Sequence, residues 1–320
     1  MSYTVILFLN RSGFEKELDE LEMEDNEISQ FFSQVNNFFS DHERPVWEFN
    51  KNKLEFNQSP FIMGILNVTP DSFSDGGKFF SDESAVQHAL AMIDEGADII
   101  DIGGESTRPG SDPISIQEEL NRVLPVITAI RKYSNIPISI DTYKSKVAEA
   151  ALGAGANIVN DISGCSIDDK MPEIVKKYNS PIILMHIKGT PKNMQMNPEY
   201  EDVVGEVYNF LNNQIQILKK ADLDKIAIDP GIGFGKRLED NLKLLNNLES
   251  FKFLGKPVLI GASRKSFLGH VLDKEVDLRL YGSLSVAVLS VLKGADIIRV
   301  HDVAETKDVL KVIKSIRSAD

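Results

Sequence analysis

Residues 96–100 read Gly96-Ala97-Asp98-Ile99-Ile100, and closely similar phrases recur at 155–159 (Gly-Ala-Asn-Ile-Val) and at 294–298 (Gly-Ala-Asp-Ile-Ile). Each phrase follows a segment of helical pattern. The glycine suits the left-handed conformation that ends many helices. The β-branched residues after it suit a buried strand. Each phrase therefore predicts a helix that turns directly into a strand.

A second pattern is a proline followed by a short apolar run, at Pro137, Pro181 and Pro257. Proline is tolerated at the first position of a strand. Further apolar runs cover residues 61–66 and 226–228. Together these patterns predict strands near residues 61, 98, 137, 158, 181, 226, 258 and 296.

Segments of helical period separate the predicted strands, for example at 85–95, 116–132 and 208–220. Strands that alternate with helices indicate a parallel α/β architecture. Eight such units match a closed (β/α)8 barrel, the TIM barrel. The alternative is an open doubly wound sheet, which usually carries a glycine-rich dinucleotide loop after its first strand. No such loop follows residues 61–66.

Residues 1–45 precede the predicted barrel, which spans 46–320. We expect a strand at 3–9, and residues 15–27 hold eight acids and one lysine. Apolar residues then recur at helical spacing, which favours an amphipathic helix packed on the barrel. A partner-binding or dimer element is the alternative for this acidic N-terminal α/β extension. The apolar positions are Ile28, Phe31, Phe32, Val35, Phe38 and Phe39.

Composition excludes several classes of protein. A net charge of −13 argues against nucleic-acid binding, which needs a basic face. The single cysteine, Cys165, excludes a disulfide framework and fits a reducing compartment. A small buried residue is a commoner role for such a cysteine than a catalytic thiol. Because no apolar run is long enough for a membrane span and 3–9 is too short for a signal peptide, we expect a cytoplasmic protein.

Polar residues end almost every predicted strand. The active site of such a barrel lies at the carboxyl ends of its strands, so these residues should share one mouth. A single Asp there could simply cap the next helix. Capping does not explain amides and cations at the same rim. The residues are Asn67, Asp101, Asp141, Asn160, Asp161, Met185, His186, Asp229, Ser263 to Ser266, and Arg299 to His301.

These residue types suit a particular chemistry. A carboxylate can hold a heterocycle with an amide and an exocyclic amine by parallel hydrogen bonds. Arg299 and His301 are two residues apart on a strand and should point to one face, where with Asn67 they could bind a phosphate and its metal. Local cations, namely Arg108, Lys265, Arg299 and His301, would outweigh the negative net charge at this mouth.

Two glycine-containing polar loops, 69–80 and 105–115, follow the first two strands and have the composition of lids. Residues 231–236 read Gly-Ile-Gly-Phe-Gly-Lys, which lacks the spacing of a phosphate loop. We expect a tight turn there that places Phe234 over the pocket.

Several stretches together resemble the dihydropteroate synthases. They are 63–77 (Met-Gly-Ile-Leu-Asn-Val-Thr-Pro-Asp-Ser-Phe-Ser-Asp-Gly-Gly), 96–109, 229–236, 263–266 and 299–302. The resemblance runs from about residue 46 to the end. The resemblance implies a homodimer, and the N-terminal extension of about 45 residues departs from the common bacterial pattern.

The resemblance implies roles for individual residues. Asp141, Asn160 and Asp229 would bind the pterin ring, with Lys265 on its carbonyl side and Met185 in the apolar floor. Asp141, Lys265 and Asp229 would be catalytic. The diphosphate would be held by Asn67, Thr107, Arg299 and His301, with Asn67 also touching Mg²⁺. The aminobenzoate site would be shaped by Phe73, Arg108, Pro109, Phe234 and Ser266.

The implied reaction belongs to folate biosynthesis. It joins a dihydropterin methyl diphosphate to 4-aminobenzoate, and the pterin cation formed when diphosphate leaves is stabilised chiefly by Asp141. Sulfonamides should inhibit, because no extra residues interrupt 264–267. Two alternatives are a pterin-binding corrinoid methyltransferase domain, which lacks the 69–75 loop, and a non-catalytic pterin-binding paralogue.

Overall fold

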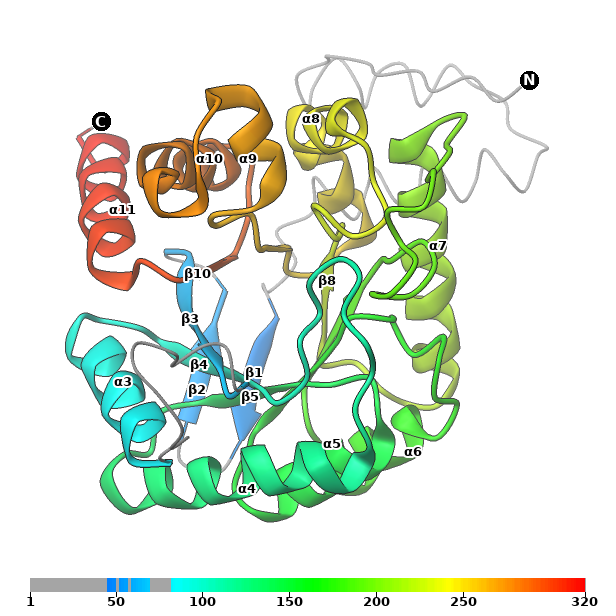
Figure 1. Cartoon of the computed structure of the whole chain (residues 1–320), viewed down its shortest axis with the longest axis vertical. Helices are drawn as coiled ribbons and strands as arrows, with labels where there is room; N and C mark the ends of the chain where they lie inside the picture. Colours follow the sequence, from blue (N-terminus) through cyan, green and yellow to red (C-terminus); the bar gives the residue numbers. More distant parts are fainter. Residues whose placement is uncertain (1–44, 50–51, 57–58, 70–81, 320) are drawn as a thin grey trace, which may run out of the picture.

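A computed structural model describes residues 45–49, 52–56, 59–69 and 82–319, and its main sheet has eight strands (Figure 1). All neighbouring strands in this sheet are parallel, and a parallel bridge between Ile228 and Val258 joins its two edges. The predicted (β/α)8 barrel is confirmed, and the open-sheet alternative is wrong. The strands are β3 (Phe61–Asn67), β4 (Ile99–Gly103), β5 (Ile138–Asp141), β6 (Ile158–Asp161), β7 (Ile182–Met185), β8 (Ile226–Asp229), β9 (Leu259–Ile260) and β10 (Ile297–Val300).

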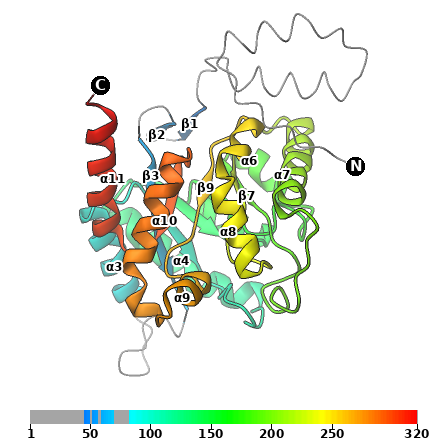
Figure 2. The same cartoon turned by 90° about the horizontal axis from the view of Figure 1, so that it is seen from above.

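Helices surround the barrel, as Figures 1 and 2 show. The three helical segments quoted from the sequence are α3, α4 and α7. Helix α7 begins earlier than expected because the Asp202 side chain caps it by accepting from Val204 N at 3.2 Å. The helices are α3 (Asp82–Asp94), α4 (Ile116–Tyr133), α5 (Ser145–Gly153), α6 (Met171–Tyr178), α7 (Val203–Lys220), α8 (Leu238–Asn246), α9 (Ser266–Leu272), α10 (Leu280–Leu292) and α11 (Val303–Arg317), with 3-10 helices η2 (Leu248–Leu254) and η3 (Val276–Leu278).

The recurring Gly-Ala-Asx phrase performs the same task at each of its three positions. Its glycine has a positive φ every time, for example +100° at Gly96, and so ends the preceding helix. Its acidic or amide side chain then accepts a backbone N–H from the neighbouring strand. The pairs are Asp98 with Ile62 (2.8 Å), Asn157 with Ile138 (3.0 Å) and Asp296 with Val258 (2.9 Å). Each phrase therefore also fixes where the next strand meets its neighbour.

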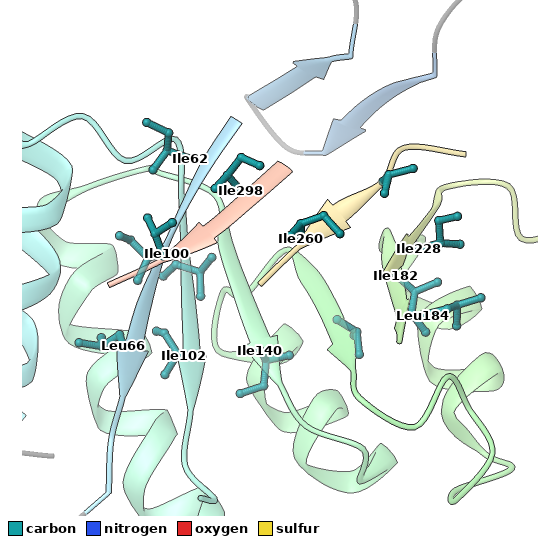
Figure 3. Packing of buried hydrophobic residues seen from close by; sticks show 14 of the residues in the cluster. Ile62, Leu66, Ile100, Ile102, Ile140, Ile182, Leu184, Ile228, Ile260 and Ile298 are labelled. Atoms are coloured by element: carbon teal, nitrogen blue, oxygen red, sulfur yellow. The ribbon is translucent and has the colours of Figure 1, made fainter. Parts of the chain in front are cut away.

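Alternate residues of each strand face outward and form the larger core. Ile62, Leu66, Ile100, Ile102 and Ile140 belong to this cluster between the strands and the helices (Figure 3). Because both faces of every strand are covered, the strands are apolar almost throughout, as a buried parallel sheet requires.

A short antiparallel hairpin, β1 (Val46–Phe49) with β2 (Asn52–Glu55), was not predicted from the sequence. Its Trp47, Leu54 and the following Phe56 are buried in one cluster with inward-facing residues at the starts of the strands, such as Met63 and Ile99. Figure 3 shows the hairpin beside this end of the barrel. The hairpin therefore closes the end of the barrel opposite the strands' carboxyl ends. The burial of the hairpin depends on barrel strands that are distant in the chain, which a local sequence pattern does not show.

Some predictions concern residues outside the described ranges. They are the strand at 3–9, the acidic run 15–27, the helix at 28–39, Phe73, and the loop 69–80 apart from Thr69. No helix among the described residues is both long and apolar enough to cross a bilayer.

Candidate active site

Most of the polar residues predicted at the strand ends do line one mouth of the barrel. Asp141 and Asp229 are the last residues of their strands, as expected. Asp101 is instead the third residue of β4, which continues to Gly103, and it lies deeper in the barrel than predicted. The cross-strand register pairs Asn67 with Gly103 and Gly103 with Asp141, so Asn67 and Asp141 flank this glycine.

Arg299 occupies the centre of the site. Its Nε donates to Asp101 Oδ2 at 2.6 Å, and its Nη2 donates to Asp141 Oδ2 at 2.7 Å. Asn160 Nδ2 also donates to Asp101 Oδ2, at 3.2 Å. The sequence-based prediction assigned Arg299 to a diphosphate and gave Asp101 no role. The structure makes them partners in one buried charge network.

The second oxygen of each acid has no hydrogen-bond donor among the described residues. Asp101 Oδ1 and Asp141 Oδ1 are buried and accept no hydrogen bond within the part of the chain that the structure describes. Burial raises the pKa of Asp141 to about 7. The negative charge of Asp101 raises this pKa as well, whereas the positive charge of Arg299 lowers it. Buried acceptors without donors are costly, so a ligand that brings N–H groups is strongly favoured here.

Asp229 and Lys265 lie at the same mouth, and the charge of each shifts the pKa of the other. Asp229 Oδ1 accepts from Gly231 N at 2.7 Å, and burial raises the pKa of Asp229. The Lys265 ammonium donates to the Ile232 carbonyl and lies 4.5 Å from the centroid of the Phe234 ring. Burial lowers the pKa of Lys265 to about 8, although the charge of Asp229 raises it. Lys265 can thus remain a cation at neutral pH while it contacts an aromatic face.

An apolar wall stands beside these charges. Met185, which we expected in the floor of the site, is buried in one cluster with Ile162, Ile187 and Met194, and Phe234 packs against this cluster. Ile187 and Met194 come from the connection between β7 and α7, where no sequence motif drew attention to them. A flat ring could rest on this wall while its edge meets the carboxylates.

The 231–236 segment is the tight turn that its glycines predicted. Gly231 has φ +72°, and a Cβ on it would lie 1.9 Å from the His186 carbonyl oxygen. Phe234 N donates to Gly231 O at 3.1 Å, which closes the turn. The turn therefore brings Phe234 to the mouth.

A buried lysine to which the sequence gave no predicted role supports this turn. Lys236 Nζ lies 2.9 Å from His186 Nδ1 and donates to the Phe234 carbonyl at 3.0 Å. Burial lowers the pKa of Lys236 to about 7, and burial together with the Lys236 charge lowers that of His186 to about 2. His186 is therefore neutral and serves as an acceptor for the turn.

His301 differs from the expectation that it is a cation. Its Nδ1 lies 3.1 Å from Ser263 Oγ. Burial lowers the pKa of His301 to about 4, with further lowering by the charges of Arg299 and Arg264. It is therefore neutral at pH 7. Arg264 pairs with Asp302 through Nε at 3.0 Å.

Thr107, predicted to hold the diphosphate, and Arg108 and Pro109, predicted to shape the aminobenzoate site, lie on the loop between β4 and α4, and Ser266, also predicted for the aminobenzoate site, begins α9. Thr107 is half-buried, and Arg108, Pro109 and Ser266 are exposed. The charge of Arg108 contributes to the lowered pKa of His301, which places Arg108 near the mouth.

Cys165 is half-buried, and burial with the nearby Asp161 raises the pKa of its thiol. A thiolate nucleophile is therefore disfavoured. Asp161 accepts from Ser163 N at 2.8 Å and from Cys165 N at 3.1 Å. Its role is to hold this turn.

The described residues hold no group of three or more His, Cys, Asp or Glu side chains able to bind a metal ion by themselves. Asn67, half-buried at the end of β3, offers one amide oxygen. Mg²⁺ commonly takes few protein ligands and completes its shell with substrate phosphate oxygens and water. The donor set fits an ion that arrives with a phosphorylated substrate.

This fold and mouth define a class of protein: a (β/α)8-barrel enzyme whose site takes a flat heterocycle rich in N–H donors. Comparison with known proteins agrees, because residues 63–301 match the family described as pterin binding enzyme. The dihydropteroate synthase of Clostridium beijerinckii is 49% identical over 263 residues, which cover 81% of this chain and 95% of that protein. That of Escherichia coli strain K12 is 47% identical over 262 residues, covering 81% and 93%. The chain therefore belongs to the pterin-binding enzymes and, among them, to the dihydropteroate synthase family.

Solved structures support the same assignment. The Yersinia pestis dihydropteroate synthase in a sulfonamide drug complex superposes with a TM-score of 0.81 at 42% identity, covering 86% of this chain and 100% of that one. A Xanthomonas albilineans dihydropteroate synthase with 4-aminobenzoic acid superposes with a TM-score of 0.80 at 41% identity, covering 86% of this chain and 100% of that one. The Xanthomonas albilineans dihydropteroate synthase in complex with 7,8-dihydropteroate superposes with a TM-score of 0.78 at 39% identity, covering 86% of this chain and 100% of that one.

Proposed function

We propose that this chain condenses (7,8-dihydropterin-6-yl)methyl diphosphate with 4-aminobenzoate to give 7,8-dihydropteroate and diphosphate. The observation that carries the proposal is the pair of buried acceptors, Asp101 Oδ1 and Asp141 Oδ1, beside the apolar wall. A dihydropterin has a planar ring and several N–H groups and would satisfy both. Relatives with this name and substrate complexes of similar structures support the same reaction.

The pterin would lie on Met185 with its edge toward Asp141, Asn160 and Asp229. Lys265 would exchange its present acceptor, the Ile232 carbonyl, for the carbonyl of the pterin. Such an exchange costs little because one charge-assisted hydrogen bond replaces another.

The charges suit a substitution at the pterin methylene. Arg299 uses Nε and Nη2 for Asp101 and Asp141, and we propose that Nη1 faces the leaving diphosphate. Positive charge that develops on the pterin would lie next to Asp141. A fixed carboxylate in a buried site stabilises such a charge more strongly than water does. The amine of 4-aminobenzoate would then attack from the side of Thr107, Arg108 and Pro109.

We propose Asn67 as a protein ligand of Mg²⁺, which when bound would neutralise charge on the diphosphate. Neutral His301 would donate one N–H to the same anion while its Nδ1 stays near Ser263. Phe73 and Ser266 would complete the aminobenzoate site.

A homodimer is the second part of the proposal. Helix α10 (Leu280–Leu292) carries no charged residue, yet Tyr281 is 75% exposed and Leu292 57%. Leu278 in η3 and Val271 in α9 are also exposed, at 61% and 55%. An exposed apolar patch of this kind commonly marks a protein interface. Light scattering should show a dimer, and Tyr281→Glu should shift it toward monomer; a monomeric wild type would contradict the proposal.

We also propose that residues 1–45 form an extension separate from the catalytic barrel at 46–320. The family match begins only at residue 63. The lone half-buried Cys165 is compatible with a reducing compartment such as the cytoplasm.

The decisive experiment follows pteroate and diphosphate in parallel, with each substrate alone and with both, in the presence of Mg²⁺ or a chelator. Product that requires both substrates, and that a sulfonamide blocks, supports the proposal. Transfer of a methyl group to a corrinoid would support the methyltransferase alternative. Tight dihydropterin binding without turnover would indicate a non-catalytic paralogue.

A further inference from the structure

A buried ion cluster lies beneath the loop that joins β4 to α4. Lys144 Nζ donates to Glu105 Oε2 at 2.6 Å and to Glu119 Oε2 at 2.7 Å. The three side chains are 13%, 5% and 1% exposed. None of them appears among the residues assigned to substrate.

The cluster is hydrogen-bonded to both ends of the loop. Lys144 Nζ donates to the Ile114 carbonyl at 2.8 Å, and Glu105 Oε2 accepts from Ile114 N at 2.9 Å. Glu105 Oε1 accepts from Tyr143 OH at 2.5 Å. Since Glu105 is the first residue of the loop and Ile114 is next to its last, these bonds close the loop at its base.

The free part of the loop carries Thr107, Arg108 and Pro109. Its contacts with the rest of the protein lie at the surface: Gly110 N donates to the Pro191 carbonyl at 3.0 Å, and Asp112 pairs with Lys192 at 2.8 Å through side chains that are 78% and 66% exposed. Within the loop, Ser111 Oγ donates to the Ser106 carbonyl at 2.5 Å and to the Arg108 carbonyl at 2.8 Å. An exposed ion pair contributes little to holding a loop. The position of the loop over the mouth therefore depends heavily on its base.

Stability alone is a weak explanation for this cluster. A buried ion pair often contributes no more than apolar side chains of the same volume would. Ionic side chains do fix donor and acceptor positions sharply, which apolar ones cannot. Asp141 ends β5 and Lys144 is the N-cap of α5 three residues later, so the short β5–α5 connection links the predicted pterin site to the loop base.

We infer that Lys144 and Glu105 are positioning residues that hold the 105–115 loop in place for 4-aminobenzoate and leave pterin binding to other groups. The inference rests on the proposed function. According to this inference, the affinity for 4-aminobenzoate depends on an ion cluster that does not contact 4-aminobenzoate.

The test compares full-length Lys144→Met with Lys146→Met, a change of an exposed lysine two residues away in α5. We measure the KM of each substrate, the dihydropterin Kd by calorimetry, and amide hydrogen exchange of peptides covering 105–115. Lys144→Met should raise the KM for 4-aminobenzoate by about tenfold or more, as small misplacements of a binding loop do. The dihydropterin Kd should stay within about twofold of wild type, and exchange in 105–115 should accelerate.

Two further variants keep the test decisive. Glu105→Gln retains the shape and an acceptor if Lys144→Met does not fold, and it should shift the KM in the same direction. Lys144→Arg keeps the charge and should restore most of the affinity. An unchanged KM for 4-aminobenzoate in a folded variant, or equal losses for both substrates, would overturn the inference. If wild type and Lys146→Met form no pteroate, the proposed function fails. The hydrogen-exchange measurement still tests whether Lys144 holds the 105–115 loop.

Discussion

Replacing Arg299 by methionine tests the charge network at the centre of the site. Methionine fills a similar volume but donates no hydrogen bond. The change removes the bonds of 2.6 Å to Asp101 and 2.7 Å to Asp141. Both carboxylates would then stay buried without a cation.

The magnitude follows from the geometry. Removing one partner of a buried ion pair costs about 3–5 kcal/mol. The Arg299 side chain is 16% exposed, so water can reach part of the vacated site. We therefore expect the free energy of unfolding at pH 8 to fall by about 3 kcal/mol, the lower end of that range.

The loss should depend on pH in a defined direction. Arg299 lowers the pKa of Asp141, which nonetheless stands at about 7 because of burial. Without Arg299 that pKa rises further, so the folded variant binds more protons than folded wild type. The difference in unfolding free energy between wild type and variant should therefore be largest above pH 7. It should shrink as the pH falls through the wild-type pKa of Asp141, about 7.

Urea unfolding at pH 8.5 and pH 6, followed by fluorescence, measures both effects. Arg317→Met, a change of an exposed arginine at the end of α11, is the matched control and should unfold like wild type. A loss of less than about 1 kcal/mol, within the range of an exposed ion pair, or a difference that grows toward pH 6, would refute the reasoning.

Three other substitutions probe separate parts of the molecule. Asp229→Ala should weaken dihydropterin binding by about 2–4 kcal/mol, because a ligand donor would lose its buried acceptor; near-native affinity by calorimetry would refute the assignment. Gly231→Ala places a Cβ 1.9 Å from the His186 carbonyl oxygen at φ +72°, so the melting temperature and kcat should both fall; an unchanged enzyme would show that the turn can relax. Trp47→Ala should cost about 3–5 kcal/mol of unfolding free energy with dihydropterin affinity intact, because the hairpin closes the opposite end of the barrel; a clear loss of affinity would mean that the two ends are coupled.

The barrel was predictable because its signals are local. A glycine at a helix end and an Asx residue that ties two strands lie within five consecutive residues, as in 96–100. The general rule that strand ends form the site then predicted that Asn160 and Asp229 lie at the mouth, and both are found within the last two residues of their strands. The β1–β2 hairpin escaped prediction because its burial depends on barrel strands that are distant in the chain, such as β8 and β10.

The sequence by itself determined which chemical groups reach the mouth: carboxylates, amides and cations at the ends of successive strands. Only the tertiary structure decided how they are paired. Arg299 meets Asp101 across 198 residues of chain, and Lys144 meets Glu105 across 39. It also decided the charge state of His301, which burial and neighbouring cations keep neutral. The physical reason is that backbone conformation is set largely by nearby residues, whereas ion pairing and pKa values depend on burial and on charges brought together by the complete fold.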